Sequence, residues 1–381
     1  MDFDFTWLLW GLPLAFALGW VASRLDLRQW RIEGRQAPKA YFRGLNHLLN
    51  EQQDQAIDAF IEAVQGDPDT AELHFALGNL FRRRGDYDRA VRVHEHLISR
   101  ADLSQKDRDR AQYALALDFL KAGLLDRAEV ALQKLEGSDH EAEASMALLG
   151  IYERSRDWPR AQAIARKLDA ADPGSYATRL AHFLCEEAEM AHREGNLART
   201  RALLEQAVSA SPQLARGWMS LSALDAQEGE DSSALDRLLV LEHHSPQHLP
   251  LAAARLAELA QKTGRVADVL PLLKAADERG PSIDITQALA DLCPTPAQAR
   301  QQYLAHLERE PSLVMATAWL EAEVDTERQA PAPVLHSLQH ASGPQRRYRC
   351  AACGFEAQRH FWQCPGCQTW DSYPARRVEE L

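Results

Sequence analysis

The sequence has few residues that interrupt helices. Only 19 of its 381 residues are glycine and 18 are proline, whereas alanine, leucine, arginine, glutamate and glutamine recur along its length. The latter five are good helix formers, so we expect an all-α chain. The chain is also longer than one hydrophobic core usually allows, which favours an extended repeat architecture or two domains.

Positive charge is also scarce. The formal net charge is −12, which argues against a general affinity for nucleic acid or anionic lipid, because both require a cationic surface. One segment differs from the rest. Residues 344–377 contain six arginines and two acidic residues, a local charge of +4 that leaves −16 for the remainder.

No catalytic motif stands out. The sequence lacks a phosphate-binding Gly-rich loop, a Gly-x-Ser-x-Gly nucleophile turn and a His-Glu-x-x-His metal site. Its carboxylates are spread evenly, as solvated helix faces require. We therefore expect that the protein is not an enzyme.

The first residues form a long uncharged run. Residues 5–23 (FTWLLWGLPLAFALGWVAS) carry no charge, and a helix of that length covers about 28 Å, close to the hydrocarbon thickness of a bilayer. A cleaved signal peptide is the alternative, but it should start with basic residues. Asp2 and Asp4 stand there instead, so we expect a transmembrane anchor over residues 1–23.

A basic juxtamembrane segment, residues 24–36, follows the anchor. It contains Arg24, Arg28, Arg31 and Arg35, whereas no Lys or Arg precedes the uncharged run. Because basic flanks stay on the inner side of a membrane, we expect the bulk of the chain to be cytoplasmic. A reducing compartment also keeps cysteines free for metal binding.

Residues 37–325 carry the pattern of tetratricopeptide (TPR) repeats. Such units span 34 residues, with a small residue at position 8, Ala at 20 and Pro at 32. In the best unit, LHFALGNLFRRRGDYDRAV, Gly78 falls at position 8 and Ala90 at position 20. The frame predicts a superhelix of about eight helix–turn–helix units, with these residues at position 20: Ala56, Ala90, Ala128, Ala161, Thr200, Ala234, Val269 and Ala299.

Proline gives an independent check on this frame. Six of the eight units have it at position 32: Pro68, Pro173, Pro212, Pro246, Pro281 and Pro311. Proline there ends the second helix, because it lacks an N–H donor and clashes with the preceding turn. Spacings of 38 residues after Ala90 and 39 after Ala161 predict longer helices or loops at those places.

The concave face of the repeats is the expected place for partner binding. Positions 2, 5, 9 and 12 of each first helix line that face, and in units two and three they include Glu72, Phe75, Asn79, Arg82, Arg110 and Tyr113. Charged, aromatic and amide groups suit recognition of a protein segment. A merely solvated face explains the same residues equally well.

Four of the six cysteines follow a looser stretch, residues 326–345. Cys350 and Cys353 form one C-x-x-C pair, and Cys364 and Cys367 form a second, with ten residues between the pairs. Two turns that each present two thiolates complete a tetrahedral site for one metal ion, iron or zinc. A segment as short as 346–381 needs such an ion, or disulfides, to fold. Four thiolates leave no open position for a substrate, so the metal should be structural.

The two cysteine pairs resemble the knuckles of rubredoxins. Cys353-Gly354 matches the first knuckle and CPGC the second, but Gln368 stands where that family has a second glycine. The loop between the pairs is also shorter than in electron-transfer rubredoxins. Both departures argue against a redox function.

The order of these parts resembles lipopolysaccharide assembly protein B of Gram-negative bacteria. The likeness runs from the anchor through YFRGLNHLLNEQQDQAIDAF and HFALGNLFRRRGDYDRAVRVH to YRCAACGF and WQCPGCQTW, nearly the whole chain. It implies a single-pass inner-membrane adaptor, with its bulk in the cytoplasm, that regulates lipopolysaccharide synthesis. The implied partners are a membrane-anchored ATP-dependent zinc protease, the lipid A-committing deacetylase that it degrades, and lipopolysaccharide assembly proteins. Homo-oligomerisation is left open.

Other function classes remain as alternatives. A nucleic-acid-binding zinc ribbon would use the local charge of +4 and the aromatic residues around the cysteines. A rubredoxin-type electron carrier would use the four thiolates to hold a redox-active iron. A periplasmic TPR chaperone would need the opposite topology. The acidic remainder of the chain makes us expect no nucleic acid among the partners.

Overall fold

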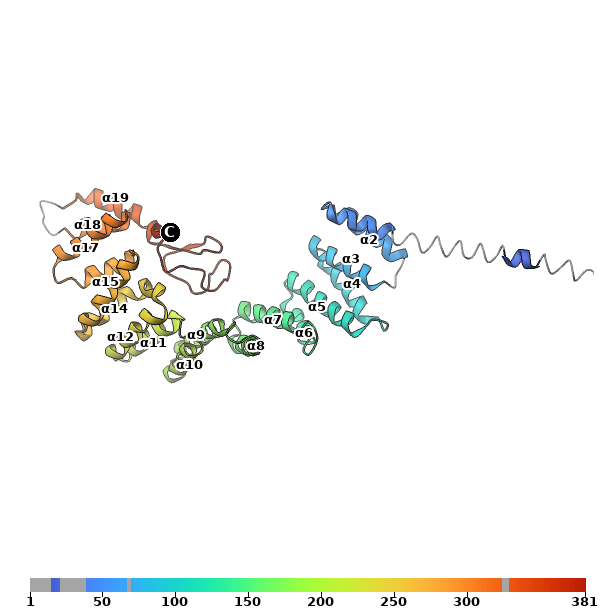
Figure 1. Ribbon diagram of the computed structural model, residues 1–381, viewed down its shortest axis with the longest axis horizontal. Coiled ribbons are helices and arrows are strands. Elements are labelled where there is room, and N and C mark those ends of the chain that lie inside the picture. The colour runs from blue at the N-terminus through green and yellow to red at the C-terminus, as the bar shows by residue number, and fades with distance from the viewer. Residues whose placement is uncertain (1–14, 21–38, 67–69, 324–328) are drawn as a thin grey trace, which may run out of the picture. The chain divides into compact units, whose positions relative to one another are not determined.

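The computed structural model describes residues 15–20, 39–66, 70–323 and 329–381, and α-helices dominate these ranges (Figure 1). The chain divides into two compact units, residues 1–155 and 156–381, each taken by itself below. Most of the predicted anchor and all of the basic segment lie outside the described residues, apart from a helical stretch at 15–20. Within the described ranges, no helix has the length and apolar character that a membrane crossing requires.

The helices follow one another in consecutive packed pairs, as TPR units require. The first unit contains a helix at 39–49, α2 (Gln53–Gly66), α3 (Ala71–Arg84), α4 (Tyr87–Ser99), α5 (Gln105–Lys121), α6 (Leu125–Gln133) and α7 (Glu141–Ser155). The second contains α8 (Trp158–Ala171), α9 (Ala177–Arg193), α10 (Leu197–Ala210), α11 (Ala215–Gln227), α12 (Asp231–Leu239), α13 (Leu241–His244), η1 (Pro246–His248), α14 (Leu249–Thr263), α15 (Val266–Arg279), α16 (Ile283–Asp291), α17 (Pro296–Arg309), α18 (Leu313–Glu321) and α19 (Ala332–Ser342). The chain ends with η2 (Pro344–Arg346), β1 (Tyr348–Arg349), β2 (Glu356–Ala357) and η3 (Val378–Glu380).

The repeat frame predicted from the sequence is confirmed at its small positions. Ala56, Ala90, Ala128, Ala161, Ala234 and Val269 are fully buried, Thr200 is nearly so, and Ala299 of the last unit is only half-buried. Four second helices, α8, α10, α15 and α17, each end two residues before the proline at position 32. Small buried residues let the paired helices approach closely, and each pair then buries its remaining apolar face against the next.

Gly78 shows how close that approach is. A Cβ at this position of α3 would lie 2.5 Å from Nε2 of His94 on α4. His94 is completely buried, and its Nδ1 is hydrogen-bonded at 2.5 Å to the equally buried carboxylate of Asp118 on α5. Arg82 donates to the other oxygen of Asp118 at 2.9 Å. One buried carboxylate therefore links three helices of two neighbouring repeats.

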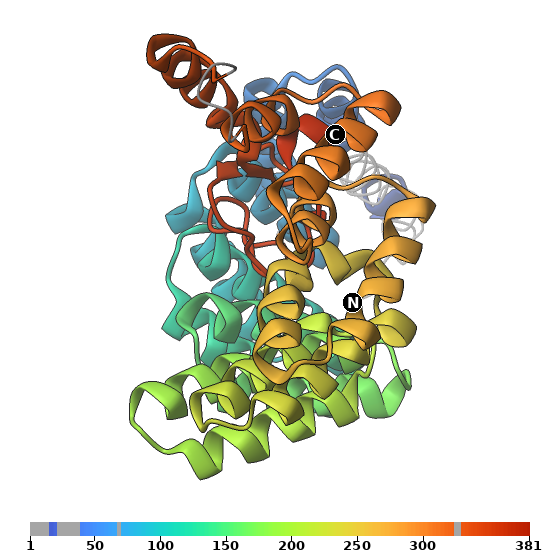
Figure 2. The same cartoon turned by 90° about the vertical axis from the view of Figure 1, so that its left-hand side faces the viewer.

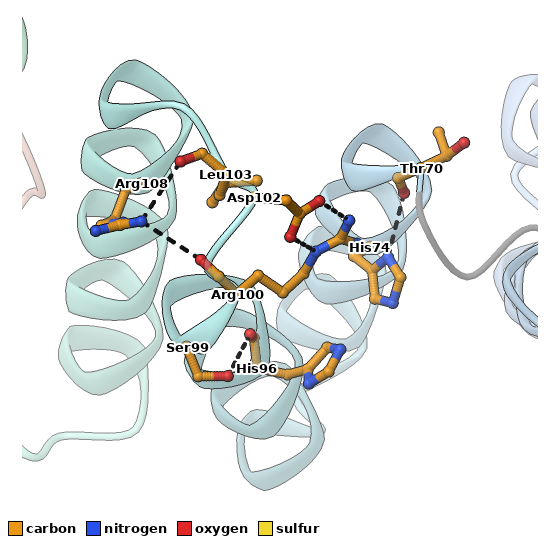
Figure 3. Close-up of polar contacts among 8 residues, drawn as sticks. All are labelled: Thr70, His74, His96, Ser99, Arg100, Asp102, Leu103 and Arg108. Atoms are coloured by element: carbon orange, nitrogen blue, oxygen red, sulfur yellow. Dashed lines mark hydrogen bonds and ion pairs between the residues drawn. The ribbon is translucent and has the colours of Figure 1, made fainter.

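The long spacing after Ala90 corresponds to a longer loop and helix. Residues 100–104 connect α4 to α5, and α5 has 17 residues where α3 has 14. In this loop Asp102 stands where other units have proline, and Arg100 donates two hydrogen bonds to its carboxylate, which lowers the pKa of Asp102 (Figure 3). Arg108 donates to the carbonyls of Arg100 and Leu103. The side chains of Arg100 and Arg108 thus hold the loop after α4 in place, where other repeat units have a proline.

The C-terminal segment lies against the last helices of the second unit (Figures 1 and 2). β1 and β2 form a two-stranded antiparallel sheet in which Tyr348 is opposite Ala357 and Arg349 is opposite Glu356. Apart from η3, the rest of residues 346–381 is turns and irregular backbone. Their own buried apolar group is small and centres on Tyr348, Cys350, Cys364 and Tyr373. This segment, called the knuckle below, therefore needs further support to hold its shape.

The two glycines Gly78 and Gly150 give a matched test of the packing. Gly78→Ala should lower the free energy of unfolding by about 1–3 kcal/mol, because the new methyl group overlaps the His94 ring. Gly150→Ala, in α7 of the same unit, meets no atom within 4 Å and should raise it by about 1 kcal/mol through helix propensity. Urea unfolding of both variants measures the two values. Equal effects would contradict the close approach of α3 and α4.

Candidate metal centre

Two backbone turns of the same design hold the four cysteines. In the first, Gly354 N–H donates to the carbonyl of Cys350, and Cys350 N–H donates to the carbonyl of Phe355. In the second, Gln368 N–H donates to the carbonyl of Cys364, and Cys364 N–H donates to that of Thr369. Each turn brings the two cysteines of one C-x-x-C pair to the same side of the backbone, as the spacing predicts.

The second turn keeps its shape without glycine. Gly354 has a φ of 78° and Gln368 a φ of 60°, so both adopt the left-handed conformation. Glycine reaches that region freely, whereas another residue pays a steric cost of about 1 kcal/mol. The Gln368 departure from the rubredoxin pattern therefore strains the knuckle locally and leaves the placement of the sulfurs intact.

The four sulfurs fit one tetrahedral ion. All four ligand atoms lie within 4.8 Å of one another, with 3.8 Å between the Sγ atoms of Cys350 and Cys367 and 3.7 Å between those of Cys353 and Cys364. A tetrahedron with metal–sulfur bonds of about 2.3 Å has edges of about 3.8 Å, whereas a disulfide requires about 2.0 Å. Among the described residues this is the sole cluster of metal-ligand type. A bound ion would supply the crosslink that the small core of the knuckle lacks.

Hydrogen bonds prepare part of this cluster for ionisation. Burial raises the pKa of Cys350, but its hydrogen bonds with the Ser372 hydroxyl and nearby backbone groups outweigh this effect and bring the pKa to about 6. The Thr369 hydroxyl lowers the pKa of Cys367. For Cys353, a backbone bond lowers the pKa, yet desolvation and the neighbouring sulfurs raise it to about 12. Four thiolates so close together repel one another, so they cannot all be charged without a cation between them. A divalent metal ion would supply that positive charge.

One side of the knuckle packs on α8 and α9. The Trp370 ring stacks on the ring of His182 with 4.5 Å between centroids, and its edge meets the rings of Trp158 and Phe183. The carboxylate of Asp371 lies 2.9 Å from Nε2 of His182. Burial lowers the pKa of His182 despite this partner, which favours the neutral ring and its stacking.

The other side is held by the residues after the knuckle's last turn. Arg377 forms a bidentate ion pair with Asp284 on α16, at 2.8 and 2.6 Å. Glu379 accepts hydrogen bonds from the first two backbone N–H groups of α18, and Glu380 accepts one from the first N–H of α16. Carboxylates at helix N-termini satisfy free donors and the helix dipole. The sequence shows only an acidic pair at this point, so its capping role was not predicted.

The six predicted partner-binding residues come together on α3 and α5. Glu72 and Arg110 form an ion pair at 2.6 Å, and the Arg110 guanidinium lies 4.1 Å from the Phe75 ring centre. Phe75 is only 2% exposed, so it serves the core. Arg82 donates hydrogen bonds to Asp118 and Asn79, and the Tyr113 ring stacks on the ring of His140. Partner binding by this group stays a prediction.

Known proteins share both parts of this arrangement. The sequence pattern of the rubredoxin metal binding domain matches residues 348–373, and that of the tetratricopeptide repeat matches residues 73–111. Lipopolysaccharide assembly protein B of Escherichia coli (strain K12) is 30% identical over 97% of this chain and 98% of its own length. The chain belongs to the lipopolysaccharide assembly protein B family. The family's member in Haemophilus influenzae is 27% identical over 95% of this chain and 96% of its own.

Solved structures of TPR-containing proteins are also similar to this chain, at low sequence identity. A TPR protein from Parabacteroides merdae is 13% identical, with a TM-score of 0.35 over 68% of this chain and 99% of its own. A complex of Naa15 and Naa10 bound to HypK is 14% identical, with a TM-score of 0.43 over 81% of this chain and 47% of its own.

Loss of one ligand should empty the metal centre. Cys364→Ser should reduce the bound metal to well below one ion per chain and make the knuckle sensitive to protease, because metal binding supplies its folding free energy. Cys293→Ser is the matched control, since Cys293 lies outside the cluster and contacts a backbone carbonyl of α16. Elemental analysis and limited proteolysis measure both effects. Full metal content in Cys364→Ser would contradict the four-sulfur site.

The strained turn offers a stabilising change. Gln368→Gly should relieve the left-handed conformation and raise the stability of the knuckle by up to about 1 kcal/mol. Gly354→Ala, at the equivalent point of the first turn, should lower it by a similar amount, because its φ is also positive. The urea concentration at which a chelator removes the metal measures the stability of the knuckle in both variants. The same sign for the two variants would contradict this account of the turns.

Proposed function

We propose that this protein is an adaptor in lipopolysaccharide assembly that holds other proteins together instead of catalysing a reaction. The observation that carries this proposal is the form of the second unit: a stack of helix pairs with a four-cysteine knuckle fastened to it at both sides. Such a unit offers broad, rigid surfaces, and four thiolates leave no coordination position for a substrate. The name of the relatives supports the process.

The location belongs to the same proposal. The uncharged run at 5–23 would cross the inner membrane once, and the arginines after it would keep the repeats on the cytoplasmic side. An anchored adaptor is confined to the surface on which membrane-bound partners work. Confinement raises the effective concentration of the adaptor for those partners without any added contact.

The proposed partners are a membrane-anchored ATP-dependent zinc protease and the deacetylase that commits precursors to lipid A. The adaptor would present the deacetylase to the protease and so set the rate of lipopolysaccharide synthesis. It would also gather lipopolysaccharide assembly proteins. Glu72, Asn79, Arg110 and Tyr113 keep some exposed surface on α3 and α5, and a partner segment would meet them there.

Affinity capture from a Gram-negative host tests the proposal. The full-length protein, kept in its membrane, should recover both the protease and the deacetylase, identified by mass spectrometry. Arg110→Glu should reduce recovery of at least one of them several-fold, because it replaces a cation beside Glu72 with a second anion. Arg92→Glu, on the exposed side of α4, is the matched control and should recover both.

The outcomes separate the parts of the proposal. Recovery of neither protein with the unchanged chain would overturn the adaptor function. Equal recovery with Arg110→Glu and Arg92→Glu would keep the adaptor function and remove the α3–α5 surface from it. Nucleic acid or redox proteins in place of the two partners would favour the alternative functions.

A further inference from the structure

A small hollow in the second unit is lined by two arginines that have no acidic partner. It has a volume of about 300 Å³ and lies where η1 and the start of α14 meet the end of α15, the start of α16 and the C-terminal segment. Arg279 and Arg376 both line it. Most arginines of this unit are paired with carboxylates, whereas these two form no ion pair with any residue that the structure describes.

Neutral hydrogen-bonding groups complete the lining. Ser282, the residue before α16, is 3% exposed, and its Oγ has no hydrogen-bond partner among the described residues. Ser282 does not cap α16 through its side chain, although serine at that position usually does. Gln247, on η1, also lines the hollow, and its amide donates one hydrogen bond to Ser245 Oγ. A buried hydroxyl without a partner costs free energy unless a ligand or water satisfies it.

The backbone at Gly280 gives one arginine room to reach the hollow. A Cβ on Gly280 would lie 3.3 Å from Nη2 of Arg376, so the absence of a side chain lets the guanidinium lie directly against the end of α15. Arg376 comes from the C-terminal segment and Arg279 from α15. Their convergence therefore depends on the docked knuckle.

The acidic groups near the hollow are already engaged. Glu380 accepts hydrogen bonds from the backbone N–H groups of Ile283 and Arg377, and its carboxylate lies close to the Ser282 hydroxyl. Asp284 is neutralised by Arg377. The charge that faces the hollow itself is that of two guanidinium groups.

We propose that this hollow binds a phosphoryl group. Two planar guanidiniums provide several N–H donors for a dianion, and Ser282 and Gln247 provide neutral donors. The volume lies at the lower end of the range for small-molecule sites, so it admits the phosphoryl group and part of what carries it. The carrier is a soluble phosphorylated metabolite or the headgroup of a phospholipid. This site is independent of the adaptor surface on α3 and α5.

Calorimetric titration of the full-length protein with pyrophosphate tests the site. The protein is reconstituted in nanodiscs of neutral phosphatidylcholine, so that the lipid supplies no competing phosphate monoester. The unchanged protein should bind pyrophosphate, and Arg279→Gln with Arg376→Gln should weaken binding by about tenfold or more. Ser282→Ala, which leaves both charges in place, should weaken it by a smaller factor.

A control with the same change of charge excludes a general electrostatic effect. Arg193→Gln with Arg255→Gln removes one exposed and one half-buried arginine of the same unit, which already pair with Glu189 and Glu258, and it should leave binding unchanged. Helical circular dichroism and metal content verify that each variant is folded. Absence of binding by the unchanged protein, or equal binding by the two double variants, would overturn the proposal.

Two further titrations identify the carrier. Glucose 1-phosphate represents a soluble metabolite, and dihexanoyl phosphatidic acid represents a lipid headgroup in water-soluble form. Tighter binding of either one, lost with Arg279→Gln and Arg376→Gln, supports the phosphoryl site and names its source. Binding of both that survives these substitutions counts against the site.

Discussion

The second unit depends on the convergence of four cysteine sulfurs. Residues 346–381 have two short strands and a small apolar core of their own, so without a crosslink this segment has too little buried surface to fold. The turns around Cys350 and Cys364 provide the sites for that crosslink. Once they are fixed, Trp370, Arg377 and Glu379 reach the helices that hold the knuckle in place.

Much of this arrangement was predictable because it follows from local chemistry. The position of Ala90 in its repeat and the spacing of the two C-x-x-C pairs depend on residues near them in the sequence, and the structure confirms the helix pairs and the sulfur cluster. The sequence also shows that Gln368 replaces the second glycine of the rubredoxin pattern. It does not show the structural effect of that replacement, because only the backbone reveals that Gln368 adopts the left-handed conformation usual for glycine.

The contacts between distant residues were not predictable in the same way. Nothing in the sequence pairs His182 with Asp371, or links Asp118 to both His94 and Arg82. An acidic residue in a helix usually indicates a solvated face, yet Asp118 is completely buried. Likewise, Phe75 occupies a position that lines the concave face in the repeat frame, but its ring is covered by Arg110 and the neighbouring core.

The docked knuckle also changes how the second unit should unfold. In a simple repeat array each unit contacts only its neighbours, so the ends fray first and the rest follows in steps. Here Asp371 contacts His182 across 189 positions of the sequence, while Glu379 caps α18 and Glu380 caps α16. These contacts link α9, near the start of the unit, to α16 and α18, near its end, through the knuckle. Loss of one helix pair then releases the others, and the unit gains the cooperativity of a globular domain.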